Sequence, residues 1–204
     1  MRFLKKLFGI LAVVVIVLVA VAYLLPREVA VSRSIQIAAG PDTVFPHVNS
    51  LHKFSEWSPW SSIDPEMRVT YSGPETGVGN KMDWTSEHPN VGNGSQIITA
   101  STQNESVKTA LDFGPMGTAD AEFVLAQKDG GTEVTWGFTG ENTFVQQAMF
   151  RLMSMDLDAM VGADYEAGLA NLKAMAEKAH MEAEAAKAAA EAAEAEEMEE
   201  AILE

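Results

Sequence analysis

The chain of 204 residues contains no cysteine, so disulfide bonds, cysteine-ligated zinc and thiol redox chemistry are excluded. Basic residues are scarce, because 14 Lys and Arg stand against 29 Asp and Glu and give a formal net charge of −15. Outside the extreme N-terminus these cations form no cluster. Since nucleic-acid binding depends on clustered Lys and Arg that neutralise phosphates, the composition argues against a nucleic-acid partner.

Motifs that would indicate catalysis or cofactor binding are also missing. The four histidines, at positions 47, 52, 88 and 180, have no HExxH or HxH spacing, so we expect no metal site. No GxSxG sequence is present, and the paired glycines at 77–79 and 92–94 lack the spacing of nucleotide-binding loops and are typical of turns. His88 beside Glu87 has the composition of an acid–base pair, but we expect the two residues to lie in a solvated loop. We therefore predict no catalytic residue, no metal and no cofactor.

What the chain does contain is an uncharged apolar run at residues 7–25. As a helix it would be roughly 28 Å long, close to the ~30 Å hydrocarbon core of a bilayer. Arg2, Lys5 and Lys6 precede it and no basic cluster follows. The positive-inside rule then predicts a single-pass anchor, residues 1–26, with its N-terminus in the cytoplasm and the remaining chain on the extracytoplasmic side, which is the periplasm in a bacterium. Ala20-Val21-Ala22 leaves cleavage after Ala22 as the alternative.

The following segment, residues 27–176, has the length of one domain and mostly alternating hydrophobicity. The expected strands are 29–37, 67–72, 80–87, 95–101, 106–113, 119–127 and 132–140, with a hairpin turn at 129–131. A short helix is expected at 43–51, shortened or bent by Pro46. Arg33 stands at a position of the first strand where the alternation predicts an apolar residue, so this residue does not fit the pattern.

From Phe144 the apolar spacing changes to three and four residues, which predicts a long amphipathic helix. Its methionines, at 149, 153, 155 and 160, suit an irregular ligand or an ordinary core. Ala, Glu and Lys continue without Gly or Pro through residues 177–204, so we expect the helix to run on into solvent as an acidic tail that frays at its end. The tail is a candidate surface for a basic protein partner.

The order of elements predicts an α+β domain in which a long C-terminal helix covers an antiparallel sheet. Particular stretches strengthen this reading, namely residues 31–37, Trp57-Ser-Pro-Trp60, Tyr71-Ser-Gly-Pro74, Trp84, Gly131-Thr-Glu-Val-Thr-Trp136 and residues 162–173. With them, residues 28–176 resemble the SRPBCC superfamily, which includes START-type, Bet v 1-like and polyketide cyclase/dehydrase-like proteins. The resemblance implies a helix-grip fold, with about seven curved strands wrapped round the helix and an elongated apolar cavity between them. Some members bind lipids, sterols or polyketides, and a few catalyse cyclisation or dehydration.

Candidate ligand-binding residues follow from the strand parity and the helix pattern. Ala159, Gly162, Ala163 and Gly168 are small helix residues that would keep a cavity open, whereas large inward strand residues would line it. Trp57 and Trp60 are expected on a rigid loop at the mouth, near residues 55–63. The predicted ligand-binding set is Trp57, Trp60, Met82, Trp84, Phe113, Phe123, Trp136, Phe138, Met155 and Ala159. The alternative is that these side chains meet and fill the core.

The function expected from these features is non-catalytic binding of a small hydrophobic or amphipathic molecule, with lipids among the candidates, by a membrane-anchored domain. A cyclase or dehydratase-like enzyme is the first alternative. It needs two inward titratable groups, yet by parity most of the candidates Asp83, Asp112, Glu133 and Thr135 point outward. The second alternative is a protein-interaction module that acts through the acidic tail.

Overall fold

The computed structural model describes residue 9 and residues 27–141, 143, 146–147 and 156–203. The membrane span expected at residues 7–25 lies, apart from Gly9, outside these residues. The same holds for Phe144 and for the methionines at 149, 153 and 155. Among the residues described, none of the helices is long and apolar enough to cross a bilayer.

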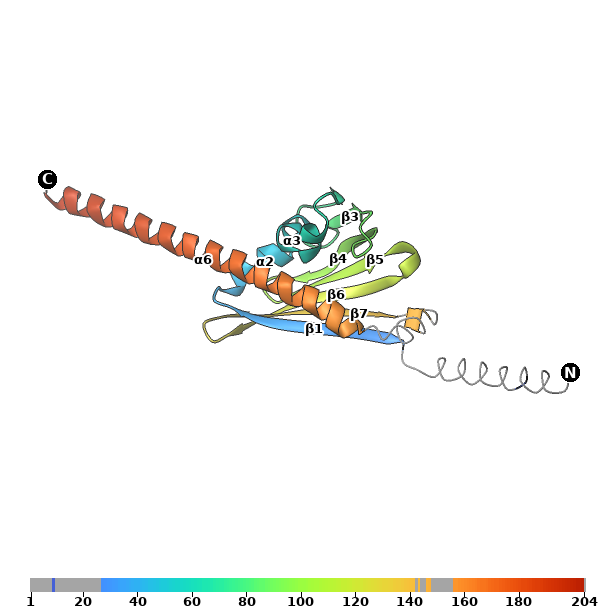
Figure 1. Cartoon of the computed structure of the whole chain (residues 1–204). Helices are drawn as coiled ribbons and strands as arrows, with labels where there is room; N and C mark the ends of the chain where they lie inside the picture. Colours follow the sequence, from blue (N-terminus) through green and yellow to red (C-terminus); the bar gives the residue numbers. More distant parts are fainter. Residues whose placement is uncertain (1–8, 10–26, 142, 144–145, 148–155, 204) are drawn as a thin grey trace.

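A single seven-stranded antiparallel sheet forms the centre of the domain (Figure 1). Its strands are β1 (Glu28–Ile37), β2 (Arg68–Ser72), β3 (Lys81–Thr85), β4 (Gly94–Thr102), β5 (Ser106–Asp112), β6 (Thr118–Lys128) and β7 (Gly131–Glu141). The strands lie in the order β1-β7-β6-β5-β4-β3-β2. Strands β2 to β7 therefore form a meander, and β1 pairs with β7 to form one edge of the sheet. At the β6–β7 hairpin, Asp129 and Gly130 both have positive φ, which confirms the predicted turn.

The two faces of the sheet differ as the alternating sequence predicts. Val134 pairs with Ile35 and Leu125 on the inner face, which the helices cover. Thr135 lies on the outer face, where its Oγ1 is 2.8 Å from Oγ of Ser34. The register places Asp83, Asp112 and Glu133 on the same outer face. Their predicted outward orientation is therefore confirmed, and they form no acid–base group on the inner face.

Three short helices follow β1, where the sequence predicted one helix and a loop. They are α2 (Pro41–Val48), α3 (Leu51–Trp57) and α4 (Pro59–Ile63). The helix predicted at 43–51 therefore ends at Val48, and extended Ser50 precedes the next helix. The loop predicted at 55–63 is wrong for a related reason. Pro59 favours an extended Ser58 and then suits the first turn of a new helix, so this stretch is helical on both sides of Ser58.

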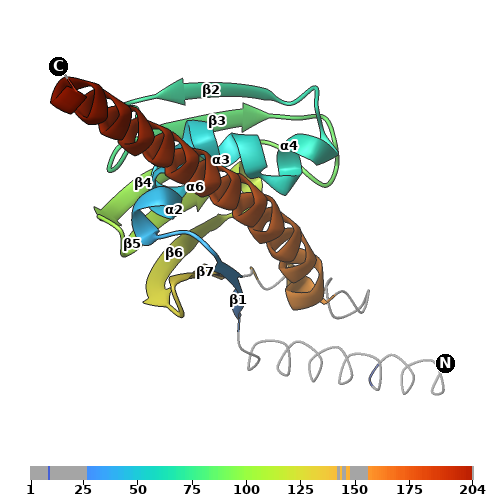
Figure 2. The ribbon, with the colours of Figure 1, turned by 90° about the vertical axis from the view of Figure 1, so that its left-hand side faces the viewer.

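The C-terminal helix α6 spans Leu157–Leu203, about 70 Å at ~1.5 Å per residue. A continuous helix from Phe144 was expected, but Asp156 is not helical and its Oδ1 accepts a hydrogen bond from N–H of Ala159 at 3.1 Å. Asp156 thus caps α6 and sets its start. The predicted helical continuation is present, because α6 runs on to Leu203 and projects away from the sheet (Figures 1 and 2).

Within the domain, α6 packs along the edge strand β1. Lys173 Nζ donates to the carbonyl oxygen of Gln36 at 2.6 Å, and N–H of Ala38 donates to Glu177 Oε1 at 2.8 Å. These bonds occupy backbone groups that an edge strand otherwise leaves open to another chain. The Ala38 N–H and, next, Lys173 lower the pKa of Glu177 below its ordinary value.

Candidate functional site

A cluster of aromatic rings occupies the inner face where β6 and β7 meet the helices. Trp136 on β7 is stacked on Tyr165 of α6, with ring centroids 3.7 Å apart and planes 11° apart. Phe123 of β6 lies at 5.0 Å and Trp57 of α3 at 5.4 Å from the Trp136 ring. All four side chains are buried. Trp57, Phe123 and Trp136, predicted as ligand-lining residues, are therefore packed against one another in the core.

The two tryptophans predicted at a cavity mouth have different positions. Trp57 ends α3 and is buried, and its Nε1 donates to the carbonyl oxygen of His47 at 3.1 Å. Its expected place on an exposed lip is wrong, because the helical turn directs the indole into the core. Trp60 on α4 is half-buried and meets Trp136 edge to face, with ring centroids 5.8 Å apart. Trp60 alone of the pair lies at the margin of the cluster.

A second aromatic group lies on the inner face across the sheet. Trp84 of β3 and Phe113 are in edge-to-face contact, with ring centroids 6.0 Å apart. Trp84 covers Gly94 so closely that a methyl group there would collide with the indole. Met82, also on β3, is buried with its sulfur 3.3 Å from the Ser55 hydroxyl of α3. The inner face is thus occupied by Met82, Trp84 and Phe113, as the alternation of side chains along the strands predicts.

Between the two aromatic groups, the inner face carries aliphatic and polar side chains, among them Leu111 and Ile98. We call Gln96, Thr109, Ala119 and Ala121 the inner floor. The register joins them, since Thr109 pairs with Ala121 across β5 and β6, and Ala121 pairs with Phe138 of β7. Phe138 is half-buried at the β7 side of this floor. All four floor residues are buried.

The inner floor also holds a buried polar pair. Gln96 is 4% exposed and Thr109 is 1% exposed. Gln96 Nε2 donates to Thr109 Oγ1 at 3.0 Å, and Thr109 Oγ1 donates to the carbonyl oxygen of Ala121 at 3.4 Å. Sequence reasoning missed this pair. Its signal was present in the inward parity of Gln96 on β4 and of Thr109 on β5.

The helix residues predicted to line a cavity do not behave as expected. Ala159 and Ala163 are exposed, so they face solvent and not the sheet. Met155 lies outside the described residues. The glycines of α6 face inward, but they leave no open space. A Cβ at Gly162 would collide with the Arg33 guanidinium, and one at Gly168 would crowd Trp136 at 2.9 Å. These glycines instead allow α6 to approach β1 and β7 closely.

Titratable groups on the inner side are few. Among the described residues, the buried polar side chains are Ser, Asn, Thr and Gln, with no Asp, Glu or His. Burial raises the pKa of the Tyr165 phenol above its ordinary value. Burial and then the nearby Lys53 lower the pKa of half-buried His47. Within the described ranges there is also no group of three metal-ligating side chains. The arrangement is suited to bind apolar surface and supplies no paired acid and base.

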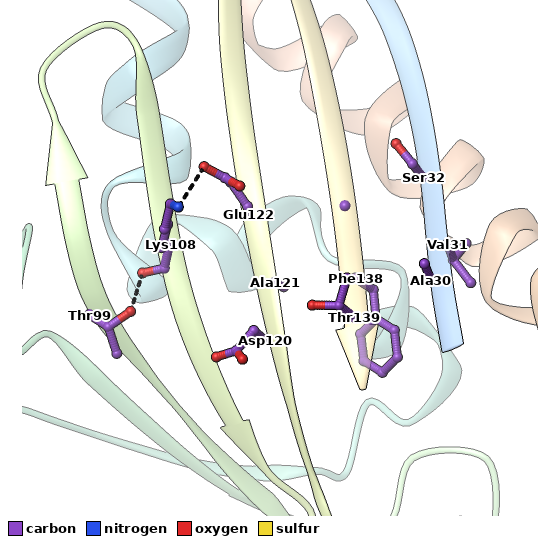
Figure 3. A pocket seen from close by; sticks show the side chains of 11 residues that line it. Ala30, Val31, Ser32, Thr99, Lys108, Asp120, Ala121, Glu122, Phe138 and Thr139 are labelled. Carbon is purple, nitrogen blue, oxygen red and sulfur yellow. Dashed lines mark hydrogen bonds and ion pairs between the residues drawn. The ribbon is translucent and has the colours of Figure 1, made fainter. Parts of the chain in front are cut away.

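The outer face carries two hollows that sequence reasoning missed. The first, about 470 Å³, crosses β1, β7, β6, β5 and β4 (Figure 3). Lys108 Nζ lies 3.5 Å from Glu122 Oε1 at its side, and Gly137 adds no side chain to its base. The second, about 640 Å³, lies nearby and is bordered by Glu28, Asp120 and Glu141. Both are lined by apolar as well as polar and charged residues, with Val31 and Phe138 in the first and Ile97 and Leu111 in the second.

Comparison with known proteins points to the same architecture. Residues 28–177 match the family described as "Polyketide cyclase / dehydrase and lipid transport". No curated protein sequence matches the chain.

Solved structures with the same fold include three with low sequence identity. A putative uncharacterized protein from Rhizobium leguminosarum has a TM-score of 0.55 at 11% identity, covering 74% of this chain and 95% of its own. A Staphylococcus aureus protein of unknown function has a TM-score of 0.53 at 13% identity, covering 74% and 94%. The di-domain ARO/CYC StfQ from the steffimycin biosynthetic pathway has a TM-score of 0.53 at 11% identity, covering 74% of this chain and 51% of its own. These similarities concern the fold alone.

Proposed function

Because the chain belongs to the polyketide cyclase / dehydrase and lipid transport family, we propose that it binds a small hydrophobic or amphipathic molecule on the inner face of its sheet. The ligand lies over the inner floor, with Trp84 and Phe113 on one side and Phe138 on the other. The observation that carries this proposal is the apolar inner face, where Thr109, Ala119 and Ala121 lie between the rings of Trp84 and Phe113 and the ring of Phe138.

Binding here is driven by removal of apolar surface from water. At about 25 cal/mol per Å², burying ~300 Å² contributes roughly 7 kcal/mol before the costs of association. Trp84, Phe113 and Phe138 offer flat apolar faces or edges, which suit a ring system or an acyl chain. The core cluster around Trp136 packs the helices against the sheet. It is not part of the proposed ligand surface.

The proposed role is binding and not catalysis. General acid–base chemistry requires two groups with displaced pKa values on the ligand side. In the described part of the chain, the floor carries an amide and a hydroxyl but no carboxylate or imidazole. We therefore favour a carrier or a sensor over a cyclase.

The proposal includes a location at a membrane surface. The apolar run at residues 7–25, with Arg2, Lys5 and Lys6 before it, supports a single-pass anchor with the domain on the extracytoplasmic side. Apolar ligands partition into the same bilayer, so an anchored domain meets them at a high local concentration. This location is tested by adding protease to intact cells and to cells whose outer envelope has been opened. Cleavage of the domain is measured in both.

The ligand site is tested with two phenylalanine substitutions on one strand. Ala121→Phe fills the inner floor, whereas Ala126→Phe adds the same ring to the exposed outer face of β6. Native mass spectrometry of the full chain released from lipid nanodiscs measures bound small molecules. We expect an added mass in the wild type and in Ala126→Phe, and its loss in Ala121→Phe.

Circular dichroism and thermal melting show whether Ala121→Phe is folded, since overpacking a core costs about 1–3 kcal/mol. If it does not fold, Ala119→Val occludes less of the floor and takes its place. An added mass that is equal in all variants places the molecule elsewhere and refutes the proposal. A wild type that carries no added mass and takes up no anilinonaphthalene sulfonate refutes it as well.

A further inference from the structure

The side-chain amide of Gln96 is almost completely buried but uses little of its hydrogen-bonding capacity. An amide carries two N–H donors and an oxygen with two lone pairs. In the structure, the Gln96 side chain makes one hydrogen bond, from Nε2 to Thr109 Oγ1. Its other N–H and its carbonyl oxygen make no hydrogen bond to the described residues, although the oxygen is not one of the fully buried side-chain atoms that lack a partner. Buried polar groups in proteins are normally paired, so this amide requires an explanation.

The surroundings of Gln96 are apolar and do not explain the amide. Its cross-strand neighbours on the inner face are Met82 and Leu111. Leucine would fill the same volume and match those neighbours without an unpaired polar group. The amide therefore weakens the core unless a group from outside the chain completes its hydrogen bonds.

Thr109 orients the amide toward the inner floor. Its hydroxyl accepts from Gln96 and donates to the backbone oxygen of Ala121. This chain of bonds fixes one end of the amide against β5 and β6. The remaining donor and acceptor are then held in place beside the small side chains over which the ligand is proposed to lie.

We propose that Gln96, positioned by Thr109, is the specificity-determining group of this site and selects apolar ligands that carry a carbonyl or hydroxyl oxygen. This inference rests on the proposed function. A ligand carbonyl accepts from the free Gln96 N–H, and a ligand hydroxyl can also donate to Gln96 Oε1. A pure hydrocarbon of the same shape gains the apolar contacts but leaves the amide unpaired. The site thus discriminates between ligands by one oxygen atom.

Trp136 carries a buried donor without a partner, at Nε1, but it does not serve the same purpose. Tyr165 is stacked on its ring, and Phe54, Trp57 and Trp60 meet it edge to face. Gln96, by contrast, is itself part of the inner floor and keeps one N–H and its oxygen free of hydrogen bonds to the described residues.

The test compares two bicyclic probes that differ in one oxygen, 1-tetralone and tetralin. Dissociation constants are measured by saturation-transfer NMR on the full chain in nanodiscs of constant lipid content. The wild type is expected to bind 1-tetralone at least about fivefold more tightly than tetralin, after correction for partition into empty nanodiscs, as one neutral hydrogen bond implies. In Gln96→Leu this ratio falls to about one, through weaker 1-tetralone binding with tetralin unchanged. Thr109→Val reduces the ratio partly, because it removes the positioning hydroxyl and not the amide.

Two variants separate the failure of this inference from the failure of the proposed function. Ala121→Phe blocks the site and Ala126→Phe is its outer-face control. If both probes bind the wild type, Ala121→Phe abolishes binding, and Gln96→Leu leaves the ratio unchanged, then the site exists and the role of Gln96 is wrong. If Ala121→Phe has no effect on either probe, or neither probe binds, then the proposed function fails and this inference fails with it. Thermal melting of Gln96→Leu confirms that the variant is folded, and we expect it to be as stable as the wild type.

Discussion

The guanidinium group of Arg33 on β1 lies against the backbone of Gly162 on α6, in the space that a side chain at residue 162 would occupy. Arg33 Nε donates to Glu166 Oε1 at 2.8 Å, and Nη2 donates to both Oδ2 and the backbone oxygen of Asp158 at 3.1 Å. Arg33 occupies a strand position where the alternation predicts an apolar side chain. The position accommodates Arg33 because α6 supplies two carboxylates and a glycine. This clamp holds the first turns of α6 to the edge strand.

Gly162→Ala is expected to destabilise the domain. In a solvent-exposed helix the change would stabilise by up to about 1 kcal/mol, but here the methyl group would collide with the Arg33 guanidinium. We expect a loss of about 1–3 kcal/mol in the free energy of unfolding, measured by urea denaturation. In the Arg33→Leu background the penalty should shrink, since the two residues are in contact. A stabilising Gly162→Ala would show that the clamp is not formed.

The clamp also makes stability depend on pH in the acidic range. The hydrogen bond from Arg33 lowers the pKa of Asp158 below its ordinary value. A carboxyl with a lowered folded-state pKa contributes stability above its unfolded pKa, and this contribution disappears as the pH falls through the folded pKa. We therefore expect Asp158→Asn to lower the melting temperature at pH 7 but to have a smaller effect at a pH well below the ordinary Asp pKa of about 3.9. The effect should decrease in high salt because Asp158 is exposed. An equal effect at both pH values would contradict this linkage.

Two buried tryptophans should respond differently to the same substitution. Trp57 and Trp136 are each 2% exposed, but only Trp57 Nε1 donates a hydrogen bond, to the oxygen of His47. Trp57→Phe therefore leaves a backbone oxygen without its partner, whereas Trp136→Phe removes an unpaired donor. We expect Trp57→Phe to cost about 1 kcal/mol more in the free energy of unfolding. Equal costs would mean that ring packing alone decides both.

The β1 edge is expected to lose protection when its helix partner is removed. N–H of Ala38 donates to Glu177, so Glu177→Ala should speed hydrogen exchange at the Ala38 amide. The matched control is Glu182→Ala, which breaks an exposed pair with Lys178 on the same helix and should leave Ala38 unchanged. Exchange at Ala38 measured by NMR checks both. Unchanged exchange in Glu177→Ala would show that another group protects this amide.

The order of elements could be predicted from the sequence because its signals are local. Alternation of apolar residues located β5, β6 and β7 to within a few residues, and Asp129 with Gly130 marked the hairpin between them. The change to a spacing of three and four residues indicated the C-terminal helix. Its start was missed because the Asp156 cap interrupts a pattern that otherwise reads as continuous.

The contacts between elements could not be predicted in this way. Sequence reasoning missed Gln96 and Thr109, because their pairing depends on the register of β4 on β5. Trp57 was expected at a mouth and Ala159 in a cavity, and the rotation of α3 and α6 about their axes reversed both. By itself the sequence determined the strands, the long helix and the inward face of each strand, since these follow from the conformational periods of the backbone. Only the tertiary structure decided which side chains meet across that face, because register and helix rotation arise from packing between residues far apart in the chain.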